Sequence, residues 1–440
     1  MSHRHGTILI VTIWVTLVLA GLVLMFGRSM RISAYVAANA MARQQADTIL
    51  DGGVQYALAR LEDEDFDAAD DDETPYKAKA VGNGYLWLLK SSPDDDGSVE
   101  YGLNDESAKI NLNSASLEML QKLPGMTSEL AASIIDWRDE DGDLTEGGAE
   151  DEYYLMLSSP YSCKNADLES VEEILLIQGG SEEILFGEDT NCNSMLDDNE
   201  DNGDESEPED DRDGILDSGL YDYVTVYSQE ENVDADGNKR INITDTDARS
   251  DLQTLLEGTF EEDRALEILA MIPSTNVSYD NILDFYYESG MELKEFEQIA
   301  DKLTTDSNET LVGLVNVNTA SQAVLECLPE LEASDAEALI QKREASNTNL
   351  DSIAWVIEAL GDDGQDKAIA IGSYITVRSS QYTADVVSAS GNGRAFRRAR
   401  VVLDSTDSLQ PIRSWKSLTH LGWPLERETL TTLQEGRSLR

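Results

Sequence analysis

The chain has 440 residues and carries 87 acidic against 32 basic side chains, a formal net charge of −55 at pH 7. So negative a surface disfavours binding to nucleic acid or anionic lipid and attracts divalent cations. The length allows two or three domains with cores of their own. Three cysteines are too few for a dense disulfide framework, and three histidines weigh against a histidine-dependent catalytic site or a zinc centre.

An uncharged, mostly apolar segment runs from Gly6 to Phe26 near the amino terminus. As a helix it is long enough to cross a hydrocarbon core of about 30 Å. Apolar residues then recur at helical spacing as far as Leu61 without an intervening proline, which predicts one continuous helix over residues 7–62. We expect the first half of this helix to span a membrane and the second half to lie outside it.

The residues before the apolar segment, 1–6, form a short basic leader that ends in glycine. This form is typical of type IV prepilins, in which a prepilin peptidase cuts after the glycine, and here the cut would separate Gly6 from Thr7. Two alternatives are an ordinary signal peptide, for which Ala38-Asn39-Ala40 supplies a small-x-small site, and a plain membrane anchor. The signal peptide fits less well because that site lies well beyond the apolar segment.

Most pilins carry a glutamate at the fifth position after the cut, and this chain has Val11 there. A carboxylate in lipid is costly without a partner, which in a pilus is the amine of the neighbouring subunit. A subunit without this glutamate needs no neighbour on that side. The sequence therefore predicts a subunit that sits at the tip of a fibre.

Two separated stretches carry the pattern of an antiparallel sheet. In residues 80–106 two short apolar strands flank a polar turn, and in residues 371–440 longer strands flank the turn Asn392-Gly393. The later strands need the early hairpin to complete a sheet. We therefore expect an α+β fold, in which residues 107–370 form a helical domain inserted between the two halves of one sheet.

The inserted segment repeats one pattern three times: a short apolar–asparagine pair, a helix, a tight turn and a second helix. The pairs are Ile110-Asn111, Ile241-Asn242 and Val315-Asn316. The repeats resemble helix-hairpin-helix motifs, which in nucleic-acid enzymes offer backbone amides and lysines to phosphate. Carboxylates surround the turns here and repel phosphate, so we predict a scaffold for protein packing and no binding of nucleic acid.

Residues 188–217 are dense in aspartate and glutamate, and part of this acidic insert follows the twelve-residue calcium-loop pattern. The expected ligands are, in loop order, Asp189, Asn191, Asn193, the backbone carbonyl of Met195, Asp197 and Glu200. Ser194 stands where the pattern has glycine, which strains the turn. A second, poorer match supplies Asp211, Asp213 and Asp217 without a closing glutamate. The alternative is a solvated, disordered acidic loop.

A strand is expected at residues 220–228, after the acidic insert. Asp234 to Gly237 then read as a turn that joins Tyr223–Tyr227 to Ile241–Ile243 in a hairpin rather than as a metal site. Further along, Arg394, Arg397, Arg398 and Arg400 form a rare basic cluster. Its partners could be acidic neighbours in this chain or another subunit, and the sequence does not choose between them.

Two carboxylates, Glu150 and Asp151, could perform acid–base chemistry. No nucleophile, histidine or metal cluster accompanies them in the sequence, so we expect them to hold their loop by hydrogen bonds, and no catalytic residue is assigned. Cys163 and Cys192 could form a disulfide in an oxidising compartment, whereas Cys327 lies in an apolar helix and is expected to fill a core.

One block of residues resembles a known family. Ile134-Ile135-Asp136-Trp137, then Gly148-Ala149-Glu150-Asp151, then Tyr153-Tyr154 and Pro160-Tyr161 look like type II secretion system protein K, the largest minor pseudopilin. The leader, Val11 and the repeats follow in family order. The chain departs from the family pattern in its acidic insert and in Thr7, which stands where pilins usually have phenylalanine, the residue whose amine is methylated.

The resemblance implies a single-pass protein of the inner membrane with its carboxyl-terminal head in the periplasm. It implies a minor pseudopilin, not an enzyme, at the tip of the pseudopilus, where it helps to start or cap assembly and the export of folded proteins. The implied partners are the other minor pseudopilins, the major pseudopilin and the prepilin peptidase, and calcium is the implied cofactor. Rival functions are a calcium-dependent adhesin of a type IV pilus, a membrane-anchored periplasmic hydrolase and a DNA-uptake factor.

Overall fold

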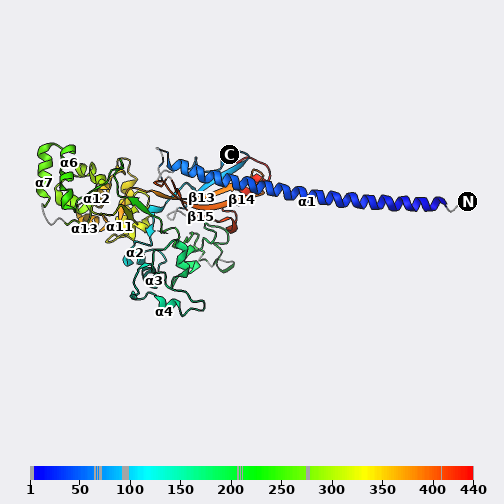
Figure 1. The fold of residues 1–440 in the computed structure, drawn as a ribbon, viewed down its shortest axis with the longest axis horizontal. Coiled ribbons are helices and arrows are strands. Elements are labelled where there is room, and N and C mark those ends of the chain that lie inside the picture. The colour runs from blue at the N-terminus through cyan, green and yellow to red at the C-terminus, as the bar shows by residue number, and fades with distance from the viewer. Residues whose placement is uncertain are drawn as a thin grey trace.

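The computed structural model describes residues 4–439 except 64, 65, 67, 69–71, 92–98, 206, 207, 209, 211, 274–277 and 408. A single helix, α1 (Arg4–Leu61), opens the fold and projects as a rod from the rest of the molecule (Figure 1). Its large apolar side chains from Ile8 to Met41 are exposed. Within the described part of the chain, α1 is the one helix long and apolar enough to cross a membrane.

The sheet is antiparallel and is assembled from the two separated stretches, as predicted. Its strands are β1 (Lys79–Val81), β2 (Gly84–Lys90), β3 (Glu100–Tyr101), β4 (Asn104–Asp105), β13 (Gln381–Ala389), β14 (Phe396–Asp404) and β15 (Ile412–Ser417). The strand order is β1-β2-β13-β14-β15, with β3 beside β2 and β4 beside β13. Residues 300 positions apart, such as Trp87 and Val387, are therefore direct neighbours in the sheet.

Alternating side chains give the sheet two buried faces. On one face, Ile49, Val54 and Ala57 of α1 pack with Leu86 and Val386. On the other face, a tryptophan-centred cluster packs against α14 (Arg427–Gln434), which lies beyond the Leu421–Pro424 segment. Because the side chains alternate, one face of the sheet is buried against α1 and the other against α14, which gives an α+β fold.

Three helical units make up the insertion, and each begins with the apolar–asparagine pair found in the sequence. Unit 1 (110–225) contains β5 (Ile110–Asn111), α2 (Leu117–Gln121), α3 (Ser128–Arg138) and β6 (Val224–Thr225). Unit 2 (241–304) contains β8 (Ile241–Asn242), α6 (Arg249–Thr259), α7 (Glu262–Met271) and β9 (Leu303–Thr304). Unit 3 (315–376) contains β11 (Val315–Asn316), α10 (Gln322–Glu326), α11 (Ala333–Arg343) and β12 (Ile375–Thr376).

Shorter elements connect and complete these units. They are η1 (Glu106–Ala108), α4 (Asp151–Tyr154), η2 (Val171–Leu176), α5 (Glu182–Phe186), η3 (Gly203–Glu205), β7 (Gln229–Glu231), η4 (Thr246–Ala248), α8 (Ile282–Ser289), α9 (Leu293–Glu297), η5 (Ala300–Lys302), β10 (Thr310–Val312), α12 (Ala354–Leu360), η6 (Asp362–Gly364), α13 (Gln365–Ile371) and η7 (Thr419–Leu421). Cys327 is fully buried in the core that the three units share, as predicted.

Each unit closes in the same way, and this corrects one prediction. The first strand of every unit pairs in parallel with the strand at its end: β5 with β6, β8 with β9, and β11 with β12. The expected hairpin between residues 223–227 and 241–243 is therefore wrong, although Asp234 to Gly237 do form a tight turn bracketed by a bridge between Val233 and Lys239. The apolar strands pair elsewhere because each completes the core of its own unit.

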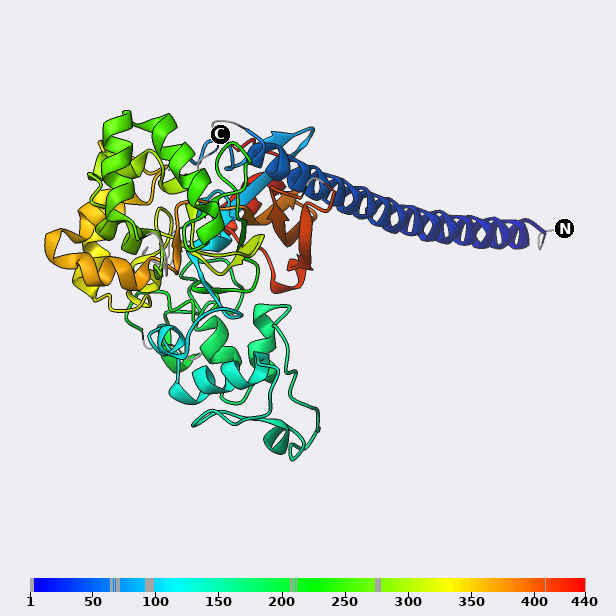
Figure 2. The ribbon, with the colours of Figure 1, turned by 60° about the vertical axis from the view of Figure 1, so that its left-hand side comes forward.

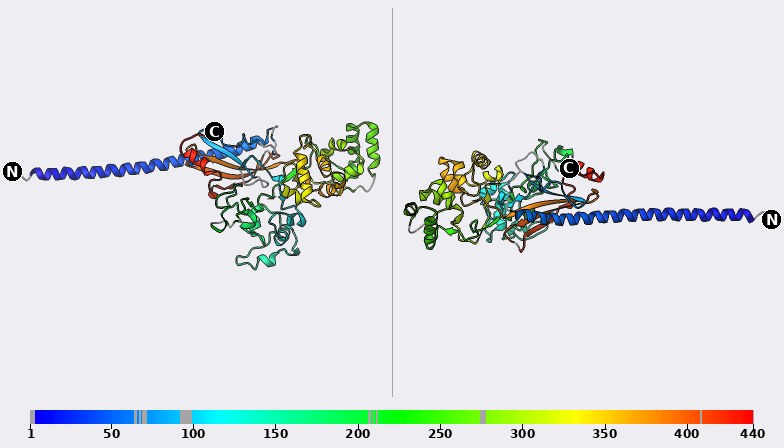
Figure 3. Two further views of the ribbon diagram at one scale, coloured as in Figure 1. Left: turned by 180° about the vertical axis from the view of Figure 1, so that it is seen from behind. Right: turned by 90° about the horizontal axis from the view of Figure 1, so that it is seen from above.

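The units form two lobes around the sheet. Unit 1, with α2, α3 and α4, lies beside the sheet, while units 2 and 3 lie beyond the sheet end that faces away from the amino terminus (Figures 1 and 2). The views from behind and from above show the same order of rod, sheet and distal lobe (Figure 3). The bulk of the molecule therefore sits at the end of α1 opposite its apolar tip.

Two buried acids fix the junction between the sheet and the insertion. Asp105 accepts hydrogen bonds from the Asn316 amide at 3.0 Å and from the Ser107 backbone at 2.8 Å, and also from the hydroxyls of Thr319 and Ser379. Glu106 accepts from the hydroxyls of Thr225, in unit 1, and Thr383, in β13. Buried carboxylates need such donors, so this pair sets how the lobes meet the sheet.

Candidate functional site

Residues 189–200, called the acidic loop below, follow α5 and turn back on themselves. The Asp189 carboxylate accepts hydrogen bonds from the backbone of Asn193 at 2.9 Å and of Ser194 at 2.8 Å. Ser194 adopts a left-handed backbone with a φ of 58°, the conformation that favours glycine. This is the place at which the calcium-loop pattern has its glycine, so the backbone turns as the pattern requires in spite of the substitution.

Three of the predicted ligands of the loop are buried, and the others are half-buried. Asp189 is 5% exposed, Asn193 3% and Glu200 1%. Burial raises the pKa of Asp189 to about 6 and that of Glu200 to about 8, because water no longer stabilises their charged forms. Residues 189–200 are thus folded back on themselves, with three of the expected ligands shielded from water.

Two oxygen atoms in the loop have no hydrogen-bond partner among the described residues, Oδ1 of Asn191 and Oε1 of Glu200. They belong to the third and twelfth positions of the pattern, both of which supply ligands in calcium loops. Unsatisfied buried oxygens are costly, and a hard cation satisfies them. The donor set therefore fits calcium, a metal that binds carboxylate and amide oxygens.

The side chains are not gathered around one point in this conformation. The amide nitrogens of Asn191 and Asn193 donate to Oδ2 of Asp197, at 2.7 and 3.1 Å. Over the described residues, no three His, Cys, Asp or Glu side chains come together closely enough to hold a metal ion. Calcium binding would require both amides to rotate so that their oxygens, rather than their nitrogens, face the ion beside the Asp197 carboxylate.

The second predicted set of ligands is placed differently. Asp213 and Asp217 are exposed, and each accepts a hydrogen bond from the backbone two residues further on, Ile215 at 2.8 Å and Gly219 at 2.9 Å. Asp211 lies outside the described residues. Asp217 contacts Glu188, just before the acidic loop, through its backbone: its carbonyl accepts from the Glu188 backbone at 2.7 Å and its N–H donates to the Glu188 carboxylate at 3.3 Å. The structure therefore gives these residues local turns and brings neither carboxylate into the acidic loop.

The residues that hold the acidic loop in place are Asp385, which sequence reasoning missed, and Arg398 and Arg400, which it singled out without their role. Arg398 is 1% exposed and donates to the carbonyl of Asn191 at 2.7 Å and to that of Cys192. The basic cluster was visible in the sequence, but its partner was not. In the structure the partners of Arg398 lie in this chain. They are about 200 positions away in the sequence, which is too far for a local pattern to indicate them.

The amino-terminal signals lie on the free part of α1. The backbone is helical through Gly6 and Thr7, the two residues at the predicted cut, and Val11 is 56% exposed. The other apolar side chains along the rod are exposed as well. An exposed apolar rod has no stable place in water, so this part of α1 requires lipid or other helices around it.

The loop proposed as the site of a rival hydrolase is held only in part as predicted. The Asp151 carboxylate accepts from the Cys163 backbone at 2.8 Å. Oε1 of Glu150, in contrast, is buried without a hydrogen-bond partner in the described part of the chain. Burial, with Asp136 and Asp139 nearby, raises the pKa of Glu150. Cys163 and Cys192 are both free thiols, so no disulfide joins this loop to the acidic loop.

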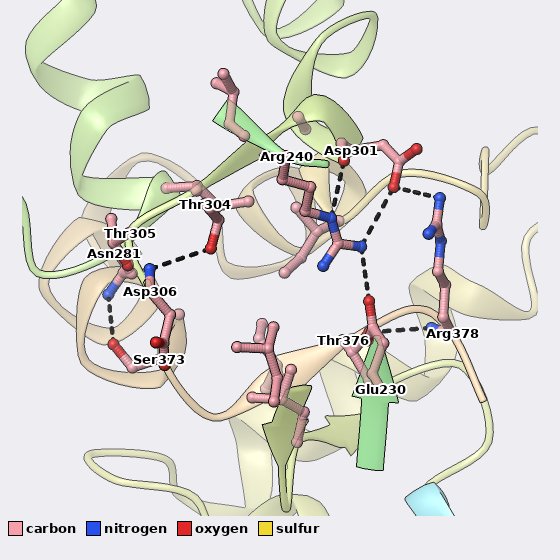
Figure 4. Close-up of a pocket in the computed structure, with 18 of the residues that line it drawn as sticks. Glu230, Arg240, Asn281, Asp301, Thr304, Thr305, Asp306, Ser373, Thr376 and Arg378 are labelled. Atoms are coloured by element: carbon pink, nitrogen blue, oxygen red, sulfur yellow. Dashed lines mark hydrogen bonds and ion pairs between the residues drawn. The ribbon is translucent and has the colours of Figure 1, made fainter. Parts of the chain in front are cut away.

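A polar cavity of about 620 Å³ opens between units 2 and 3 (Figure 4). Four of its charged side chains are paired with one another: Arg240 contacts Glu230 at 2.6 Å, and Asp301 lies between Arg240 and Arg378. The hydroxyl of Thr376 donates to the other oxygen of Glu230 at 2.6 Å. Three further carboxylates, those of Asp280, Asp306 and Asp351, also line the cavity.

Comparison with known proteins relates this chain to a protein family. Two family models, both described as type II secretion system protein K, match residues 102–186 and 315–377, which fall on units 1 and 3. Among solved structures, the GspK-GspI-GspJ complex from the type 2 secretion system of enterotoxigenic Escherichia coli is similar, with 12% identity, a TM-score of 0.39, and coverage of 85% of this chain and 94% of that one. No curated protein sequence matches the chain. From the two family matches, the chain belongs to the type II secretion system protein K family and is a minor pseudopilin of that system.

Proposed function

We propose that this pseudopilin sits at the tip of the pseudopilus and helps to start or cap its assembly. The observation that carries the proposal is the position of the distal lobe, formed by units 2 and 3, which extends past the sheet at the end away from the apolar rod (Figure 1). In a fibre built by packing rods side by side, a lobe at that end occupies the space where the next subunit would stack. The absence of a glutamate at Val11 agrees with this position.

The rod supplies the assembly contact. Its exposed apolar residues are suited first to the inner membrane, with the head in the periplasm, and then to the helices of the other minor pseudopilins and the major pseudopilin. Extraction from lipid into a helix bundle replaces one apolar environment by another, so it costs little hydrophobic free energy. We propose that prepilin peptidase frees Thr7 before this step.

We further propose that the acidic loop binds calcium, with Asp189, Asn191, Asn193, Asp197, Glu200 and the carbonyl of Met195 as ligands. The ion would supply positive charge to a buried, acid-rich turn that otherwise leaves two oxygens unsatisfied. Its contribution is structural: it holds the loop, and with it unit 1, in one conformation. Millimolar calcium outside the cytoplasm is sufficient for a site of modest affinity.

The position at the tip can be tested by imaging. Pseudopili assembled with an epitope tag after Arg440 should bind an antibody at one end only, and mass spectrometry of the mature protein should find Thr7 as its first residue. Labels spread along the shaft would contradict the tip position. Co-purification of the full-length protein in detergent with the other minor pseudopilins, with and without a chelator, tests the partners separately.

A further inference from the structure

Two arginines of the pseudopilin sheet reach across to the acidic loop. Arg398 donates to the carbonyl of Asn191 at 2.7 Å and to that of Cys192, while Arg400 donates to the same Cys192 carbonyl at 3.0 Å. Both lie on β14, on the face of the sheet opposite α1. The sheet therefore holds the loop by hydrogen bonds to the backbone carbonyls of its third and fourth positions, and these bonds do not involve the ligand side chains.

A single carboxylate aligns both guanidinium groups. Asp385 on β13 is opposite Arg400 in the strand register, and its oxygens contact Arg398 at 2.9 and 2.7 Å and Arg400 at 2.9 Å. The side chain of Asp385 is 3% exposed. Burial by itself would raise the pKa of Asp385, but the two arginines hold it below its ordinary value. This ionic group stays charged and keeps both arginines in one orientation.

The charges in this group do not cancel, because two guanidinium groups face one carboxylate. The balance comes from the insertion: Arg398 interacts with Asp189, and Asp222 lies near the same carboxylate. Arg400 also lies over the ring of Tyr221, 5.0 Å from its centre. The loop is thus held by hydrogen bonds to its backbone and by attraction to its acids, both from the sheet.

A neighbouring contact shows that the same interface continues along unit 1. Lys416 on β15 pairs with Glu172 on η2, and the Asn193 amide donates to the Pro424 carbonyl at 3.3 Å. A cation of the sheet therefore meets an acid of unit 1, and an amide of the acidic loop meets the segment that follows β15.

We propose that Arg398 and Arg400 are positioning residues that couple ion binding in the acidic loop to the pseudopilin sheet. The inference rests on the proposed calcium site. A loop whose backbone is already held needs less ordering when it binds an ion, so the arginines raise its affinity. By linkage, the ion tightens the hold of the loop on β13 and β14, and the lobe becomes fixed to the sheet when calcium is present.

The test measures calcium affinity of the full-length protein in detergent by titration calorimetry, at a temperature where each variant is folded. Arg398→Gln should weaken binding by about tenfold or more, as expected for loss of charged hydrogen bonds. Arg397→Gln is the matched control, since Arg397 is the adjacent residue, lies on the other face and pairs with Asp47 of α1. Its affinity should equal that of the native protein. A residue with only a structural role would change thermal stability without calcium and leave the affinity unaltered.

Hydrogen exchange gives a second readout in the same samples. Calcium should slow exchange in residues 381–404 of the native protein and of Arg397→Gln, and should not do so in Arg398→Gln. If Arg398→Gln does not fold, Arg400→Gln, which removes one loop contact only, should show both effects at smaller size. The coupling would be overturned if the arginine variants bound calcium as tightly as the native protein or more tightly. It would also be overturned if calcium slowed exchange in residues 381–404 of these variants as much as in the native protein.

Failure of the calcium site itself is distinguishable from failure of the coupling. The double variant Asp189→Asn, Glu200→Gln should lose calcium binding if the acidic loop is the site. If the native protein binds no calcium, or if this double variant binds it as well as the native protein, the proposed site is wrong and the coupling falls with it. If the double variant loses binding while Arg398→Gln keeps it, the site stands and only the coupling is wrong.

Discussion

Arg397 and Arg398 are adjacent in the chain, yet they connect the sheet to opposite partners. Arg397 pairs with Asp47 on the helical rod, and Arg398 pairs with Asp385 and holds the acidic loop. The alternation of side chains along β14 is the cause, because neighbouring residues face opposite sides of a sheet. The strand therefore links the membrane-directed helix on one face with the inserted lobe on the other.

The ionic group around Asp385 should dominate stability near neutral pH. Asp385→Asn leaves two buried guanidinium groups without a carboxylate, which typically costs about 3–5 kcal/mol of unfolding free energy. Because the arginines lower the pKa of Asp385, its contribution is complete above the ordinary value of 3.8 and is lost as the pH falls through the lowered pKa.

Denaturant unfolding at several pH values checks this expectation. The difference in unfolding free energy between the native protein and Asp385→Asn should be large at pH 7 and should shrink below about pH 4. A difference that stays constant over this range would show that the charge of Asp385 does not matter. Asp47→Asn, at the exposed pair on the other face, is the control and should change stability by less than about 1 kcal/mol.

Asp105 should be essential for joining the insertion to the sheet. Asp105→Ala removes the acceptor for donors of the buried Asn316 and of the half-buried Thr319 and Ser379, and an unsatisfied buried group costs about 1–3 kcal/mol. We expect a loss of at least about 2 kcal/mol in denaturant unfolding. Limited proteolysis should also cut more readily between the sheet and units 1 and 3. Equal stability of the variant would mean that these donors find other acceptors.

Two adjacent glycines of α1 should respond in opposite ways to alanine. A Cβ atom at Gly52 meets nothing within 4 Å, whereas at Gly53 it would lie 2.4 Å from a methyl group of Leu86 and 2.6 Å from one of Val386. Gly52→Ala should stabilise by about 0.5–1 kcal/mol, because alanine favours helix. Gly53→Ala should destabilise by about 1–3 kcal/mol, because it forces the helix away from a packed sheet. Thermal unfolding of the two variants compares them directly.

Ser194 should be a place where glycine improves the acidic loop. Its φ of 58° is strained for any residue with a Cβ atom, so Ser194→Gly should stabilise the protein by up to about 1 kcal/mol. It should also bind calcium more tightly, because the turn is then unstrained. Ser181→Gly is the contrast: Ser181 caps α5 with a φ of −147°, and its replacement should cost a few tenths of a kcal/mol. A loss of stability in Ser194→Gly would contradict the assigned strain.

Local patterns in the sequence were enough for several elements and for the turn of the acidic loop. The apolar run predicted the rod, the Asn392-Gly393 turn predicted the β13–β14 hairpin, and the spacing of acids predicted a turn at residues 189–200 with Ser194 in the glycine position. These features depend on side-chain periodicity and on turn chemistry, which act over a few residues and can be seen in one sequence. The calcium itself stays a prediction.

Only the tertiary structure decided which residues far apart in the sequence contact one another. Nothing near Arg398 in the sequence indicates that its guanidinium group meets the Asn191 carbonyl, and nothing near Ile241 shows that it pairs with Leu303 instead of the residues before the Asp234 turn. Such contacts join segments that are far apart in the chain and are selected by which apolar faces bury one another and which buried charges must be neutralised. Those requirements act on the folded molecule as a whole, so no local pattern records them.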